Sequence, residues 1–163
     1  MQPARLILVL APVAALALSA CQQEAQAPAE QSPSAKPGLS ARDGVLVLPA
    51  VKGNPAAAYL SLINSGDAQA SVAGVSVDAA ESAEIHETKG GKMASVDQVD
   101  VAPGSTVKFE RGGLHVMAFG LKPEVAAGNT VEITLTFADG DKLSVPLKVE
   151  TVGGAPAHDG ADH

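Results

Sequence analysis

Two methionines and two histidines are the residues of this 163-residue chain that point most directly to chemistry. Met1 belongs to an N-terminal targeting segment, so the rest of the chain keeps only Met93 and Met117. Both lie close in sequence to His86 and His115, the histidines of the part expected to fold. His115 and Met117 are two residues apart in an extended run, so both side chains leave the same face of a strand. The sequence therefore predicts a cluster that combines imidazole and thioether groups.

This set of donors favours copper, as Cu(I), over other metals. Thioether sulfur is soft and neutral and suits Cu(I), whereas zinc prefers thiolate, imidazole and carboxylate. Calcium and magnesium need oxygen donors, and the chain has no acidic loop of the EF-hand type. A blue-copper centre needs a Cys thiolate, and the only cysteine, Cys21, lies far along the chain from the cluster. We therefore expect His86, Met93, His115 and Met117 to bind and hand over Cu(I) without redox catalysis.

Other interpretations of the same residues remain open. An isolated histidine is more often an ordinary polar side chain than a ligand, and a single His-x-Met pair is weak evidence. The alternatives are a lipoprotein that stores copper or confers copper tolerance, and a structural β-sandwich lipoprotein without metal function. An enzyme is not expected, because the chain has no Gly-x-Ser-x-Gly elbow, P-loop or paired acid motif.

Composition excludes several further classes. Eleven Lys and Arg against 18 Asp and Glu give a net charge of −7, and the basic residues do not cluster. Nucleic-acid binding needs clustered cations, so we expect no nucleic-acid partner. One cysteine permits no internal disulfide and no site built on several thiolates. Aromatic residues make up only 2% of the chain, which argues against a groove that stacks bases or sugars.

The N-terminus has the pattern of a bacterial lipoprotein signal. Arg5 precedes an apolar run from 6 to 18, and small residues then lead to Cys21. This resembles a lipobox, so residues 1–20 are expected to be removed and Cys21 to carry the lipid anchor. The residue after the cysteine is Gln22 and not Asp, which resembles the outer-membrane sorting pattern of enteric-type bacteria. The alternative is an ordinary secretory signal followed by an incidental cysteine. We expect a lipid-anchored protein of the periplasm, most simply at the outer membrane.

Two polar segments flank the part expected to fold. Residues 21–42 are rich in Ala, Gln, Pro and Ser and show no periodicity, which predicts a flexible tether. Residues 153–163 have a similar character and contain His158 and His163 beside two aspartates. These side chains predict an auxiliary site with nitrogen and oxygen donors for Cu(II). Incidental histidines in a solvated tail are the alternative. Residues 43–152 form one domain of ordinary size, which we expect to be a monomer.

The sequence pattern predicts an all-β domain. Short apolar runs alternate with turn signals, and Asp139-Gly140 between two alternating runs predicts a hairpin. Eight or nine strands without an amphipathic helix predict a Greek-key β-sandwich or barrel. The expected strands are 45–48, 57–63, 71–77, 84–88, 96–101, 106–109, 114–119, 130–137 and 143–149.

Nearly the whole of this domain carries the pattern of one family, in the segments 58–66, 85–88, 91–93, 103–107, 112–117 and 120–122. These segments resemble the periplasmic copper chaperone family called PCuAC. The interval of 21 residues between Met93 and His115 matches the family's metal motif, whereas the interval of six residues between His86 and Met93 is shorter than usual. The resemblance implies a cupredoxin-like β-barrel that binds Cu(I). It also implies delivery of copper to the copper centre of cytochrome oxidase or to a partner chaperone.

Overall fold

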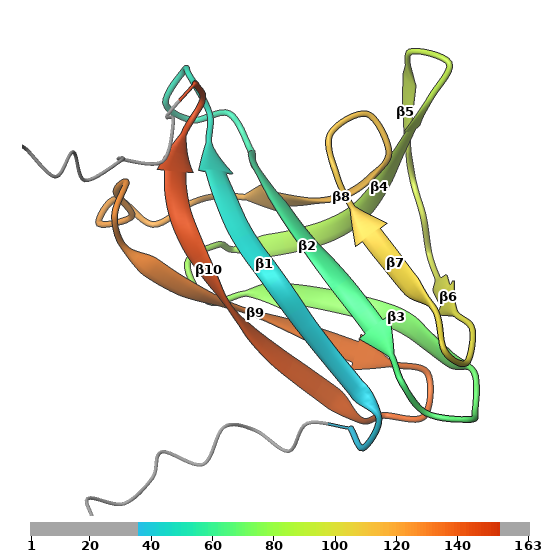
Figure 1. The fold of residues 1–163 in the computed structure, drawn as a ribbon. Helices are drawn as coiled ribbons and strands as arrows, with labels where there is room; N and C mark the ends of the chain where they lie inside the picture. Colours follow the sequence, from blue (N-terminus) through green and yellow to red (C-terminus); the bar gives the residue numbers. More distant parts are fainter. Residues whose placement is uncertain (1–35, 154–163) are drawn as a thin grey trace, which may run out of the picture. The chain divides into compact units, whose positions relative to one another are not determined.

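A computed structural model describes residues 36–153 of the chain, and these residues form strands and turns (Figure 1). None of the described residues belongs to a helix that is long and apolar enough to cross a membrane. The strands are β1 (Leu39–Leu48), β2 (Ala56–Asn64), β3 (Ala70–Val77), β4 (Ser82–Lys89), β5 (Lys92–Ser95), β6 (Val99–Val101), β7 (Thr106–Phe109), β8 (Leu114–Phe119), β9 (Thr130–Phe137) and β10 (Lys142–Thr151).

The strands form one curled sheet in the order β5-β4-β8-β7-β2-β1-β10-β9-β3-β6, with β8 also paired to β2 (Figure 1). Most neighbours are antiparallel, whereas β1 runs parallel to β10. The predicted hairpin at Asp139-Gly140 joins β9 to β10, as expected. The all-β prediction is therefore confirmed.

Alternation along the strands separates a core face from an outer face. In β2, every second residue from Ala56 to Asn64 is buried, as period-2 geometry requires. The core side of the neighbouring strands carries Ile85 of β4 and Val116 of β8, which are almost fully buried. The residues between them must leave the opposite face of the sheet, where the candidate ligands lie.

The first strand begins earlier than the sequence suggested. Residues Leu39 to Arg42, expected to belong to the tether, pair with β2 as far as Asn64. Asp43-Gly44 looked like a boundary, but it forms a bulge inside β1, and Asp43 has a φ of 58°. Gly44 lies so close to the Pro146 carbonyl oxygen that a Cβ there would be 2.4 Å from it. The turn-forming residue pair therefore bends the strand without ending it.

The expected strand 96–101 is also different in the structure. Residues Lys92 to Ser95 turn back onto β4 as β5, and only Val99–Val101 forms β6. Gly90 and Gly91 both have positive φ, at 58° and 76°, which is the geometry of a two-residue hairpin turn. This tight reversal places Met93 opposite Thr88 on β4.

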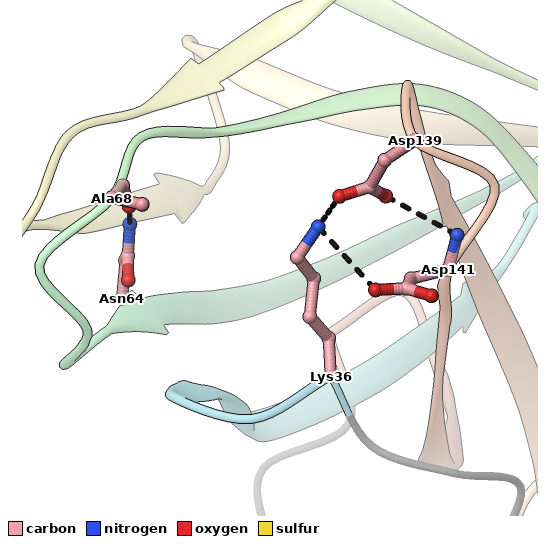
Figure 2. Close-up of polar contacts among 5 residues, drawn as sticks. All are labelled: Lys36, Asn64, Ala68, Asp139 and Asp141. Atoms are coloured by element: carbon pink, nitrogen blue, oxygen red, sulfur yellow. Dashed lines mark hydrogen bonds and ion pairs between the residues drawn. The ribbon is translucent and has the colours of Figure 1, made fainter.

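An ion-pair cluster holds the start of the described chain against the β9–β10 hairpin (Figure 2). Lys36 contacts the carboxylate of Asp139 and lies 3.5 Å from that of Asp141. Its ammonium group also lies 5.4 Å from the centre of the Phe137 ring. This end of β1 lies opposite Asn64, at the far end of β2 from Ala57, which pairs with Met117.

Candidate metal centre

Pairing of β4 with β8 brings the predicted ligands to one face of the sheet. His86 lies directly opposite His115, and Glu84 lies opposite Met117. Side chains at directly opposed positions project from the same face, and that face is the outer one here. Met93 joins them from β5, because it lies opposite Thr88, two residues after His86. Four residues from three strands are therefore gathered on the outer face.

His115 is held in one orientation by a backbone carbonyl group. Although it lies on the outer face, only 5% of its surface is exposed. Its Nδ1 lies 2.9 Å from the carbonyl oxygen of Gly113, so Nδ1–H donates and Nε2 keeps its lone pair. The same oxygen accepts the backbone N–H of Thr88 at 3.1 Å. Ligating histidines are typically oriented by an outer partner of this kind.

His86 shows the complementary arrangement. Its Nε2 lies 3.0 Å from a carboxylate oxygen of Glu84, which accepts the Nε2–H. Its Nδ1 is buried and makes no hydrogen bond within the described part of the chain. A buried polar atom without a partner costs about 1–3 kcal/mol, so this nitrogen calls for an explanation. Metal ligation through the Nδ1 lone pair would supply one.

Three of the four predicted ligands line one small hollow of about 300 Å³, which we call the donor hollow. His86 is not among its lining residues, but its ring centre lies 6.1 Å from that of His115. Met93 is 55% exposed at the outer edge, whereas Met117 is partly buried. The residues that line the donor hollow are Ala57, Tyr59, Thr88, Met93, Arg111, Gly112, His115 and Met117.

Two residues of the donor hollow were not anticipated from the sequence. Arg111 lies in the turn between β7 and β8, and Tyr59 lies in β2. The structure places the Arg111 guanidinium 5.3 Å from the centre of the Tyr59 ring. No sequence signal identifies such a contact, because it depends on how β2 and the β7–β8 turn meet.

The methionines are essential to the interpretation of this region as a metal centre. Within residues 36–153, no group of three or more His, Cys, Asp or Glu side chains is placed to hold a metal ion. A larger cavity of about 560 Å³ lies elsewhere and is lined by residues such as Asp78 and Lys122, without histidine or methionine. The predicted lipidation site Cys21 and the predicted auxiliary ligands His158 and His163 lie outside the described residues.

Comparison with known proteins agrees with the fold and the sequence pattern. Residues 39–149 match the family described as "Putative lipoprotein LpqE-like". "Putative lipoprotein Lxx21020" of Leifsonia xyli subsp. xyli is 34% identical over 128 residues, which cover 73% of this chain and 76% of that protein. The uncharacterized protein RP573 of Rickettsia prowazekii is 32% identical over 98 residues, covering 57% of this chain and 54% of that protein.

Solved structures with the same fold are PCuAC domains and a related copper protein. The copper-bound PCuAC domain of PmoF2 superposes with a TM-score of 0.62 at 23% identity, covering 73% of this chain and 97% of that domain. The Cu(I) form of DR1885 from Deinococcus radiodurans gives 0.57 at 28% identity, covering 77% of this chain and 85% of that protein. The predicted resemblance is thereby confirmed, and the chain belongs to the LpqE-like family, with the cupredoxin-like β fold of PCuAC domains.

Proposed function

We propose that this protein is a copper chaperone of the bacterial envelope, which binds Cu(I) in the donor hollow and delivers it to an acceptor. The observation that carries the proposal is the convergence of two oriented imidazoles and two thioethers on one outer face. Copper is present in similar structures, namely the PCuAC domain of PmoF2 and DR1885. The protein is a binding protein in this view, not an enzyme.

The role of each ligand follows from which of its donor atoms keeps a lone pair for the metal ion. His115 offers Nε2, because its Nδ1 proton is committed to Gly113. Met93 of β5 and Met117 of β8 both line the donor hollow and offer sulfur. His86 offers its unpartnered Nδ1, and Glu84 keeps that ring in the required tautomer. This set is neutral and soft, which suits Cu(I).

The positions of the donor residues favour delivery of copper over storage of copper. Met93 is exposed on the edge strand β5, so one ligand is within reach of an approaching protein. Neutral donors place no thiolate charge on the ion, so transfer to a thiolate-rich acceptor is downhill. We propose the copper centre of cytochrome oxidase, or another copper chaperone, as that acceptor.

The proposed location is the periplasmic side of a bacterial membrane, most simply the outer membrane. Lipid modification of Cys21 would anchor the chain there, and the lipoprotein names of the family and of the Leifsonia relative support this. The domain would act as a monomer, without a nucleic-acid partner.

A Cu(I) competition titration tests the proposed site. The full chain should be used with Cys21→Ser, because a fragment that starts at residue 43 would remove Leu39–Arg42 from β1. We expect one Cu(I) per chain, with sulfur and nitrogen scattering in X-ray absorption, and weaker binding by Met93→Leu. Scattering from nitrogen or oxygen alone would contradict the ligand set. No Cu(I) binding at all would favour the structural lipoprotein.

A transfer experiment separates a chaperone from a storage protein. The copper-loaded chain is mixed with a reduced acceptor that carries two cysteines, and the two proteins are then separated. We expect the copper to move to the acceptor without detectable return. Copper that stays on this chain at equilibrium would instead indicate storage or tolerance.

A further inference from the structure

Arg111 brings a positive charge to the edge of the donor hollow. It is the only charged residue among those that line the hollow, and no Asp or Glu lines it. The guanidinium lies 5.3 Å from the centre of the Tyr59 ring, a cation–π arrangement that holds it in place. Arg111 therefore places a positive charge beside a site that is proposed to bind a positive metal ion.

The charge of Arg111 is not neutralised by a neighbouring carboxylate. The ion pairs found among residues 36–153 belong to Lys36, Arg42 and His86, and none includes Arg111. Glu84 is committed to His86 on β4 and does not line the donor hollow. The field of Arg111 therefore acts on the hollow without a counter-charge inside it.

The turn that carries Arg111 is the same turn that orients His115. Gly112 has a φ of 79°, and the turn is closed by a bond from the Glu110 N–H to the Leu114 carbonyl oxygen. The carbonyl oxygen of Gly113, in the same turn, accepts the hydrogen bond from His115 Nδ1–H. The guanidinium and the imidazole are thus fixed on one short segment, which keeps the charge close to the donors.

Arg111 cannot itself be a ligand, because a guanidinium group has donors only and no lone pair to offer. Its effect on a bound ion is electrostatic repulsion, which doubles when the charge of the ion rises from one to two. We infer that Arg111 is a specificity residue that favours Cu(I) over Cu(II) and Zn(II) in the donor hollow. The inference rests on the proposed function and assigns the ion selectivity of that site.

The test is to compare Cu(I), Cu(II) and Zn(II) affinities of the full chain before and after Arg111→Gln. Cys21→Ser, His158→Ala and His163→Ala should be present throughout, so that the C-terminal histidines cannot bind the divalent ions. We expect the preference for Cu(I) over Cu(II) to fall about tenfold, the order for the removal of one unit-charge repulsion near a protein surface. Zn(II) affinity should rise with that of Cu(II), because Zn(II) has the same charge and no redox chemistry.

Two control variants separate charge from structure. Arg111→Lys keeps the charge and a cation–π contact, so it should keep the ion preference. Lys142→Gln removes one positive charge from an exposed position where β10 leaves the β9–β10 hairpin, and should leave the preference unchanged. Thermal melting of each metal-free variant checks that the fold is intact.

The possible outcomes are distinct. An unchanged Cu(I)-to-Cu(II) preference in Arg111→Gln, with normal Cu(I) binding, would overturn this inference and leave the proposed function standing. Equal losses for all three ions would also overturn it, because they would show that Arg111 only supports the structure. Failure of the unsubstituted chain to bind Cu(I) would overturn the proposed function, and this inference with it.

Discussion

The two faces of the sheet formed by β4, β8 and β2 differ in composition although they come from the same strands. On the core face, Ile85, Val116 and Ala58 are packed away from solvent. On the outer face, the intervening positions carry His86 and His115, which are hydrogen-bonded to carboxylate and carbonyl oxygens. The core face is apolar and closely packed, whereas the outer face is polar and opens into a hollow.

Stability and binding therefore depend on alternate residues of the same strands. Neighbours in sequence, such as Ile85 and His86, serve opposite faces because strand side chains alternate. Substitutions one residue apart should therefore separate the free energy of unfolding from Cu(I) affinity. That separation can be measured on both faces and at a remote site.

The largest effect is expected on the core face. Ile85→Ala removes a side chain that is 4% exposed, so the free energy of unfolding should fall by about 2–5 kcal/mol. Urea denaturation of the metal-free protein measures this loss. The Cu(I) affinity of the chains that remain folded should be unchanged. A loss of affinity without a loss of stability would show that the two faces are not independent.

The reverse pattern is expected for Met117→Leu. Leucine keeps volume and apolar character, so the melting temperature of the metal-free protein should change little. The substitution removes a soft donor, and Cu(I) affinity should fall by at least the roughly 10–100-fold seen when an outer partner of a metal site is lost. A competition titration measures the change, and unchanged affinity would rule out Met117 as a ligand. His115→Ala should weaken binding in the same way.

A smaller effect is expected when the support of a ligand is removed. Glu84→Gln replaces the carboxylate 3.0 Å from His86 Nε2, so the ring is less firmly held in the tautomer that exposes Nδ1. Cu(I) affinity should fall by about tenfold. His86→Ala tests the ring directly and should weaken binding by at least as much. If neither substitution changes affinity, the site consists of the three residues that line the donor hollow.

The smallest effect is expected at the far end of the domain. Lys36→Met breaks the contacts with Asp139 and Asp141, whose side chains are about half exposed (Figure 2). The free energy of unfolding should fall by only about 1 kcal/mol, the order for a surface ion pair with a cation–π contact. Calorimetry measures this loss. Cu(I) affinity should stay the same, and a change there would mean that the two ends of the sheet are coupled.

Much of the fold could be predicted from the local sequence pattern. The strands at 106–109, 114–119 and 130–137 were predicted with the bounds that the structure shows, because alternation and turn residues mark them clearly. The placement of His115 and Met117 on one face required only the period of a strand. Local pattern failed at Asp43-Gly44, where a pair that usually turns the chain forms a bulge in β1.

The sequence by itself determined where most strands lie, which donors exist and that two of them share a strand face. Tertiary structure alone decided that β4 pairs with β8 in the register that sets His86 against His115. It also decided that Arg111 lies over Tyr59 at the edge of the donor hollow. The physical reason is that alternation is a property of a single strand, whereas register and contacts between distant segments depend on how the whole core packs.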